Sequence, residues 1–387
     1  MPPQKQRKPA DATAVQPAAF GPMLDHKRSQ LAQDWVVRAI FSHVKPRNRQ
    51  YVEIGFNTNE QCATNTSGSN TCRLWLAGWS GLLLDGAHSN ATINLHSEFV
   101  TSANIVPLLR KYKVPRDVDF MSIDVDSYEM WLLEAILKSE YKPGVVAVEY
   151  NSNFPWRFTL AYPDPYQFKT RYSSDRLQHT AKGGYTGGCY SGAAPRAIAL
   201  MARKHGYVAL AAVVPLDLIL VKAELAAVAR HALNSTHFNK RETVGRWLID
   251  DPGRHAELRD GWMLNTYGNR TMTAAQALEL VDWVEWERQR ARGATADYAA
   301  KAARASALPQ LEELSCIFRL NNMRQGKCFA RLQGALPGLK GNCEQFATYR
   351  NRSAWWPSVR NSDFPGTSRV VASNGLRNVP LHQLNVF

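Results

Sequence analysis

Long apolar segments are missing from this 387-residue sequence. The longest candidate, 207–221, is interrupted by Pro215 and Asp217 and is too short to cross a bilayer. The first 22 residues are rich in Pro, Ala, Gln and Lys and contain no apolar stretch of the kind a secretory signal needs. We therefore expect no membrane span and a mobile tail over residues 1–24. A cytoplasmic location is favoured, with the secretory lumen and an organelle as alternatives.

Zinc-binding cysteine patterns are missing as well. The six cysteines form no Cys-x-x-Cys pair, and no histidine lies at zinc-finger spacing, so no zinc site is expected and no residue is assigned as a metal ligand. Free thiols are preferred. The alternative is disulfide bonding in an oxidising compartment, either between Cys62 and Cys72 or among Cys316, Cys328 and Cys343. Five Asn-x-Ser/Thr triplets also leave the compartment open.

Acidic residues are too few to balance the basic ones. The chain has 47 Lys and Arg against 33 Asp and Glu, a formal net charge of +14. A polyanionic partner such as nucleic acid would explain this excess, and so would solubility alone. Because the basic residues are scattered along the chain, both explanations stay open.

Short apolar strands alternate with amphipathic helical segments through the first 225 residues. Strand, helix, strand, repeated in this way, is typical of a doubly wound, mostly parallel, Rossmann-like α/β sheet. Strands are predicted at 51–54, 81–84, 98–100, 119–123, 145–150, 207–213 and 216–221, and helices at 29–44, 73–77, 105–112, 128–137 and 193–205.

The last two predicted strands are joined by a link too short for a crossover. Pro215-Leu216-Asp217 suits an antiparallel hairpin at the edge of the sheet. A reversed final strand is how class I methyltransferases end, whereas dinucleotide dehydrogenases usually end with a parallel one. We therefore predict a methyltransferase-type domain over residues 25–225. A C-terminal extension at 226–387 is expected to be helical over 274–290 and onward, then irregular.

The first predicted strand ends in a turn that suits a nucleoside cofactor, since such cofactors bind at the carboxyl ends of parallel strands. Gly55 can adopt positive φ there and let the backbone approach a ligand. The usual second glycine is missing, and Asn57 can take a left-handed conformation in its place. Glu53, Gly55 and Asn57 are therefore candidate cofactor-binding residues, and an ordinary turn is the alternative.

The second predicted strand ends at Asp85. An acidic residue in this position accepts hydrogen bonds from the ribose hydroxyls of a nucleoside cofactor. A polar insertion at 58–69 lengthens the usual spacing of about 20 residues between the first loop and this acid. An Asp-Gly turn is the alternative explanation.

Further acidic residues follow the fourth and fifth predicted strands. Asp124 and Asp126 leave the fourth strand, and Glu129 begins the next helix. Burying so much negative charge without a purpose is costly, so these carboxylates are expected to hold substrate, serve as a general base or share a metal. Stabilisation of a helix N-terminus is the alternative. Glu149 ends the fifth strand and is expected to face the same cleft as Asp124.

The loop after the fifth strand carries the residues expected to touch the methyl acceptor. Tyr150 and Asn151 open this loop, and Trp156 adds an aromatic face of the kind that suits sugars and flat rings. A packed surface loop with Asn in a capping role is the alternative.

Together these motifs resemble the FkbM-type methyltransferases, over about residues 47–223. The resemblance implies S-adenosylmethionine at the carboxyl edge of the sheet. Glu53 and Gly55 would then form the first cofactor loop, Asp85 would bind ribose, and Asp124 and Asp126 would lie near the reacting methyl group. The matching strings are Val52-Glu53-Ile54-Gly55, Asn70-Thr71 ahead of Gly78-Trp79-Ser80-Gly81, Ser102-Ala103-Asn104-Ile105, Ser122-Ile123-Asp124-Val125-Asp126, Val148-Glu149-Tyr150-Asn151 with Phe154-Pro155, Tyr190-Ser191-Gly192-Ala193 and His205-Gly206-Tyr207.

We therefore expect an O-methyltransferase whose acceptor is a hydroxyl on a sugar, a glycan or a small molecule. Asp124, Asp126 and Glu149 are the candidate bases. No Asn/Asp-Pro-Pro-aromatic string follows the fourth strand, which argues against methylation of nucleobases. The alternatives are a non-catalytic Rossmann-like module of a larger basic, RNA-containing complex, a nicotinamide dehydrogenase, and a glycan enzyme of the secretory pathway.

Overall fold

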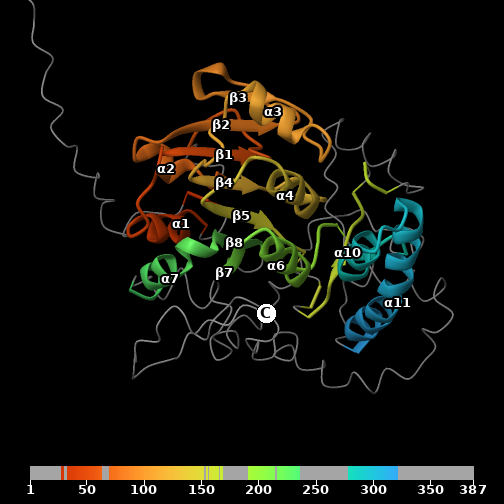
Figure 1. Cartoon of the computed structure of the whole chain (residues 1–387). Coiled ribbons are helices and arrows are strands. Elements are labelled where there is room, and N and C mark those ends of the chain that lie inside the picture. The colour runs from red at the N-terminus through yellow and green to blue at the C-terminus, as the bar shows by residue number, and fades with distance from the viewer. Residues whose placement is uncertain are drawn as a thin grey trace, which may run out of the picture.

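The computed structural model of the chain describes residues 28–29, 33–62, 69–151, 154–155, 157–164, 166–168, 191–213, 216–235 and 278–320. These residues form a seven-stranded sheet covered by helices on both faces, and a separate two-stranded sheet (Figure 1). The chain is an α/β protein, as the alternation of strand and helix patterns predicts. The expected tail at 1–24 lies outside the described residues.

The large sheet is parallel except for one strand. Its spatial order is β3-β2-β1-β4-β5-β8-β7, and the first five strands pair in parallel. β8 pairs antiparallel with both β5 and β7, so the predicted hairpin is confirmed and its second strand lies inside the sheet. The strands are β1 (Gln50–Ile54), β2 (Ser80–Asp85), β3 (Leu95–Ser97), β4 (Phe120–Ile123), β5 (Val145–Glu149), β7 (Tyr207–Val213) and β8 (Asp217–Lys222).

Apolar residues on both faces of each central strand hold two layers of helices against the sheet. In β5, Val145 and Ala147 face one core, and Val146 and Val148 face the other. The first core is completed by α1 (Gln33–Phe41), α2 (Cys72–Leu76) and α7 (Ala226–Ser235), and the second by α3 (Ile105–Lys111), α4 (Glu129–Lys138) and α6 (Pro195–Lys204). Short 3-10 helices lie at Ala91–Ile93 and Ala223–Leu225.

The third strand lies three residues earlier than predicted. β3 is centred on Leu95–Ser97 because Leu95 is the buried apolar residue that reaches the core, at 1% exposure. Glu98, expected to begin the strand, instead directs its carboxylate to Lys111 and Tyr112 at the end of α3. The prediction of a strand at 98–100 is therefore wrong in its position along the sequence.

Two segments far apart in the sequence form the small sheet beside this core. β6 (Leu160–Ala161) pairs antiparallel with β9 (Val281–Asp282). Asp282 then caps the next helix, since its Oδ1 accepts hydrogen bonds from the backbone N–H of Val284 and Glu285. The helices that follow are α10 (Trp283–Ala291) and α11 (Ala296–Leu320). The helix predicted over 274–290 begins only at Trp283, because Val281 and Asp282 form a strand with β6. Residues 274–277 lie outside the described residues.

The C-terminal helices share the core of the large sheet. The indole of Trp286 on α10 lies against Trp131 on α4 and against Phe168, with ring centroids 6.4 and 4.3 Å apart. Apolar residues of α11, among them Ala303 and Leu311, belong to the same buried cluster. Packing therefore continues across the domain boundary expected at residue 225.

Cys62 and Cys72 form a disulfide, which corrects the preference for free thiols. The polar insertion after β1 returns to the start of α2, and this return brings the two Cα atoms within 5.1 Å, a distance that a disulfide can bridge. Cys316 on α11 is also disulfide-bonded, to a residue outside the described ones. In the described part of the chain, no helix combines the length and the apolar character that crossing a bilayer requires.

Replacing Trp286 with Ala tests whether α10 and α11 stabilise the sheet. Trp286 is 1% exposed, so we expect the free energy of unfolding to fall by about 3–5 kcal/mol in urea titration. Trp75→Ala is the matched control, because that side chain is 42% exposed and its loss should cost little. Equal effects of the two substitutions would contradict a shared core.

Candidate functional site

The turn after β1 has the backbone conformation predicted for it. Gly55 has φ +89° and Asn57 has φ +52°, so the left-handed Asn57 is confirmed. The N–H groups of Gly55 and Phe56 both donate to the carbonyl of Leu84 on β2. A Cβ at position 55 would lie 1.6 Å from the backbone oxygen of Asp124. Glycine is therefore required because the end of β4 passes directly against this turn.

Asp85 joins the turn after β1 to the loop after β2. Its Oδ2 accepts from the N–H of Asn57 at 3.1 Å, and its Oδ1 accepts from the N–H groups of Ala87 and His88 at 2.8 and 2.9 Å. The Nδ1 of His88 lies 2.7 Å from the same Oδ1. Burial acts to raise the pKa of Asp85, but these hydrogen bonds together outweigh it and lower the pKa. Asp85 is thus an ionised carboxylate whose Oδ2 has one donor among the described residues.

Glu53 faces the start of α2 and not the turn after β1. Its carboxylate accepts from the N–H groups of Asn70 and Thr71, at 2.7 and 3.2 Å, and from the hydroxyls of Ser69 and Thr71. Burial raises the pKa of Glu53 to about 7, although these hydrogen bonds act to lower it. The observed role of Glu53 is to hold the segment beside the Cys62–Cys72 disulfide, so a cofactor contact for this residue gains no support.

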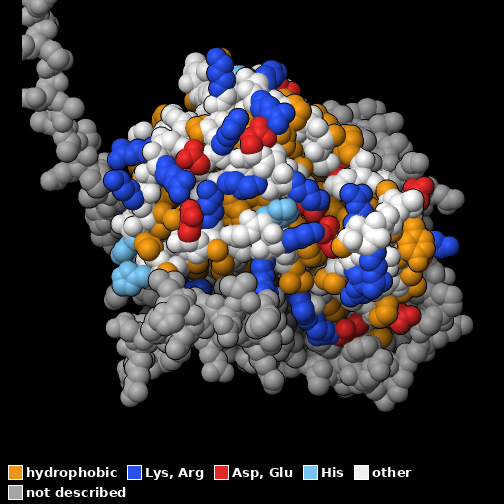
Figure 2. Space-filling model, viewed as in Figure 1, with side chains coloured by type: hydrophobic (Ala, Val, Ile, Leu, Met, Phe, Trp, Pro, Cys, Tyr) orange, Lys and Arg blue, Asp and Glu red, His pale blue; other side chains and the backbone are white. Residues whose placement is uncertain are grey.

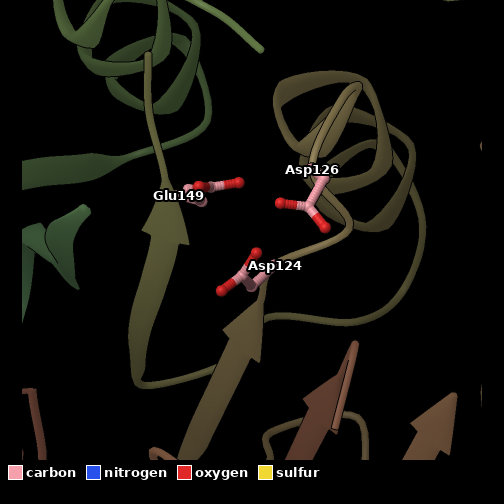
Figure 3. A group of neighbouring side chains, drawn as sticks. All are labelled: Asp124, Asp126 and Glu149. Carbon is pink, nitrogen blue, oxygen red and sulfur yellow. The ribbon is translucent and has the colours of Figure 1, made fainter. Parts of the chain in front are cut away.

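Three carboxylates converge where β4 and β5 end. Asp124 follows β4, Asp126 lies on the loop after it, and Glu149 is the last residue of β5, and the three side chains point toward one another (Figure 3). One oxygen from each lies within 4.8 Å of the others, and all three side chains are half-buried. Asp126 has φ +61°, a left-handed conformation that Asp tolerates better than most residues. Sequence reasoning placed all three at this edge.

Burial and neighbouring negative charge affect the protonation of two of these carboxylates. Burial, followed by the negative charge of Asp126, raises the pKa of Asp124 well above its usual value, while an interaction with Glu149 acts to lower it. Burial and then the charge of Asp124 raise the pKa of Glu149 in the same way.

Two fully buried acids lie behind these three. Glu129, at the first position of α4, accepts from the N–H of Val125 through Oε1 at 3.1 Å, and its Oε2 has no hydrogen-bond partner among the described residues. Asp217, the first residue of β8, lies directly opposite Glu149 in the sheet. Its Oδ2 accepts from Gln33, and its Oδ1 also has no partner in the described part of the chain. Burial raises the pKa of Glu129 to about 7 and that of Asp217 to about 6.

Asp217 is the residue that sequence reasoning missed. In the sequence it is only the last residue of a short hairpin link, and nothing local relates it to Glu149, 68 positions earlier. The antiparallel pairing of β5 with β8 puts the two side chains on one face of the sheet. A hairpin that folds back between β5 and β7 is the one signal that could have suggested this pair.

The residues expected to hold the acceptor are not open to it. Tyr150 and Asn151 are 3% and 7% exposed. The Nδ2 of Asn151 donates to the carbonyl of Ser191, and its N–H donates to the carbonyl of Ala193, so Asn151 ties the chain before α6 to the end of β5. This structural role differs both from acceptor binding and from the local capping considered as the alternative. Trp156 lies outside the described residues.

No protein-family model matches the chain, and no curated protein matches it in sequence. The resemblance to FkbM-type methyltransferases therefore remains a proposal that depends on the motifs and on the geometry of this site.

The pH dependence of folding tests the environment of Glu53. Because burial raises its pKa in the folded protein above the unfolded value of 4.5, the folded state holds this proton more tightly, and stability falls as pH rises from about 4.5 to about 7. The glutamine in Glu53→Gln does not titrate, so the stability of the variant lacks this pH dependence. The difference in the free energy of unfolding, wild type minus variant, should therefore fall by up to about 3 kcal/mol between pH 4.5 and pH 8.

Urea unfolding of both proteins at a series of pH values measures this difference. Glu140→Gln is the control of opposite sign, since the hydrogen bond with Arg110 lowers the pKa of Glu140 to about 2. If the difference in the free energy of unfolding between the wild type and Glu53→Gln grew with pH, the raised pKa of Glu53 would be contradicted.

Proposed function

We propose that the chain is an S-adenosylmethionine-dependent methyltransferase that acts on a hydroxyl group of a sugar, a glycan or a small molecule. The observation that carries this proposal is a continuous line of contacts along the carboxyl edge of the parallel strands. Asp85 accepts from Asn57, and Gly55 in the same turn packs against the backbone of Asp124. A nucleoside cofactor binds along this edge in open α/β sheets.

The order of the strands supports the same class. The first five strands follow the order 3-2-1-4-5, which doubly wound nucleotide-binding sheets share, and the reversed strand β8 follows β5 in the sheet. A dinucleotide dehydrogenase usually ends its sheet with parallel strands. The reversed strand therefore favours methyl transfer over hydride transfer.

The carboxyl edge of the sheet offers groups that suit both the ribose and the charged sulfur of S-adenosylmethionine. Asp85 keeps an ionised Oδ2 with a single described donor, which leaves it able to accept a ribose hydroxyl. Glu53 is not part of this set, because its carboxylate is taken up by residues 69–71. When bound, S-adenosylmethionine supplies a methyl group on a positively charged sulfur, which the acidic edge attracts.

On the acceptor side, the chain has to orient a hydroxyl and remove its proton. Burial and like charge raise the pKa of both Asp124 and Glu149, and a raised pKa makes the carboxylate a stronger base than an ordinary one. Asp126 faces the same point from the neighbouring loop (Figure 3). We assign the acceptor hydroxyl to this group, with transfer depending mainly on alignment.

The charge of the described surface gives little support to the alternative of a polyanion-binding module. Lys and Arg are spread over the face seen in Figure 2 and are not gathered into one block. Several exposed Lys and Arg form ion pairs with acidic partners. The pairs are Arg47 with Asp117 and Glu224, Arg110 with Glu140, Lys111 with Glu98, Lys138 with Glu134, Lys204 with Glu287, and Arg288 with Glu285.

The disulfides favour an oxidising compartment for the protein. The Cys62–Cys72 bond closes the polar insertion beside the cofactor edge, and Cys316 is bonded as well. Disulfides persist in the secretory pathway and outside cells and are rare in the cytosol. We therefore place the protein in an oxidising compartment, contrary to the cytoplasmic location that the sequence favours.

Calorimetric titration of the wild type with S-adenosylmethionine tests the proposed activity, because a methyltransferase has to bind this cofactor. Asp85→Ala should weaken binding at least about tenfold, through loss of the carboxylate that meets the ribose. Asp117→Ala is the control, because Asp117 precedes β4 at the opposite end of the strands and its side chain is 49% exposed. Thermal unfolding of each variant checks that the fold is retained.

Transfer of labelled methyl groups to a panel of glycans and small hydroxylated acceptors then tests the reaction. Binding of NAD in place of S-adenosylmethionine would contradict the proposal and favour a dehydrogenase. Cofactor binding without transfer to any acceptor in the panel would overturn the enzyme assignment.

Alkylation of the native protein without a reductant tests the disulfide. Cys62 and Cys72 should remain unmodified and appear as one cross-linked peptide in mass spectrometry, and both should react after reduction. Modification of either thiol in the unreduced protein purified from its natural source would contradict an oxidising compartment.

A further inference from the structure

We propose that Asp124, Asp126 and Glu149 bind a divalent cation that prefers oxygen ligands, such as Mg²⁺, Mn²⁺ or Ca²⁺. Each residue offers one carboxylate oxygen to a common point between the ends of β4 and β5, and these oxygens lie within 4.8 Å of one another (Figure 3). Ligand distances are about 2.1 Å for Mg²⁺ and about 2.4 Å for Ca²⁺. Two ligands of one ion can thus lie up to about 4.2 Å apart for Mg²⁺ and up to about 4.8 Å apart for Ca²⁺. The spacing fits one ion of the size of Ca²⁺ as it stands, and a smaller ion would draw the oxygens slightly closer together.

The acids behind this group point to a ligand independently. Glu129 and Asp217 are each 1% exposed, and each keeps one carboxylate oxygen without a hydrogen-bond partner among the described residues. A buried oxygen without a donor is costly in a folded protein. Asp217 lies opposite Glu149 on the same face of the sheet, and the other oxygen of Glu129 is held by the loop that carries Asp126.

The local balance of charge is the third observation. Five carboxyl groups gather at this edge, and the electrostatic effects on Asp124 come from Asp126, Asp217 and Glu129, all of the same sign. Among the described residues, the salt bridges of Lys and Arg involve none of Asp124, Glu149, Glu129 and Asp217. A divalent cation would balance part of this negative charge, with Glu129 and Asp217 acting on the ligands from nearby.

If the proposed methyltransferase activity holds, the cation would explain how a group of carboxylates can bind a hydroxyl as the methyl acceptor. A hydroxyl bound to the ion loses its proton more readily and is fixed in position relative to the methyl group. This catalytic role depends on the proposed function, whereas binding of the ion does not. The two can therefore fail separately.

Titration of the EDTA-treated and dialysed full chain with Mn²⁺, followed by calorimetry, tests the site. We expect one ion per chain, displaced by Mg²⁺ or Ca²⁺, and a rise in the thermal midpoint with increasing ion concentration. Asp124→Asn and Glu149→Gln should weaken Mn²⁺ binding at least about tenfold. Asp117→Asn, which changes an exposed acid, should bind as the wild type does.

Stability without metal separates a lost ligand from a damaged fold. Removing one of several repelling acids should leave the metal-free Asp124→Asn and Glu149→Gln proteins at least as heat-stable as the wild type, while their response to Mn²⁺ disappears. Absence of Mn²⁺ binding by the wild type would overturn the cation site. In that case, binding of S-adenosylmethionine would still support the proposed function. Conversely, Mn²⁺ binding without binding of S-adenosylmethionine would support the cation site and contradict the methyltransferase assignment.

Discussion

The close approach of β1 and β4 at their carboxyl ends is the constraint on which the rest of the site depends. The backbone oxygen of Asp124 occupies the space that a side chain at position 55 would need. Only glycine fits there, and its positive φ turns the chain toward Asp85. One contact thus fixes the turn after β1 and the position from which Asp124 enters the acidic group. A second glycine is not needed, because Asn57 adopts the left-handed conformation itself.

The acidic edge is maintained against a substantial electrostatic cost. Burial raises the pKa of Asp124, Glu149 and Asp217, and the negative charge of Asp217 adds to the rise for Asp124 and Glu149. A protein selected for stability alone would replace several of these acids with neutral residues. Glu53 shows the contrast, because its buried carboxylate is surrounded by donors from residues 69–71 and so has a structural explanation. Among the described residues, Asp124 and Glu149 have no such set of donors, and this difference singles them out as a candidate site.

Elements distant in the sequence hold this edge in place. The Cys62–Cys72 disulfide and Glu53 secure the insertion between β1 and α2. On the other side of the sheet, Trp286 of α10 packs against α4, whose first turn carries Glu129. The C-terminal helices therefore pack against the helix that begins at the candidate site, and the buried core continues past residue 225.

The sequence by itself determined six of the seven strands of the large sheet, the order of the acidic motifs and the special conformation of Asn57, because apolar periodicity and turn chemistry are local properties. It also placed Asp124, Asp126 and Glu149 at one edge, since the carboxyl ends of parallel strands lie together. Only the tertiary structure decided the roles of Glu53 and Asn151, the partnership of Asp217 with Glu149, the disulfide and the packing of α10 and α11. Each of these depends on which side of an element faces which neighbour, and contacts between residues so far apart along the chain leave no local pattern to read.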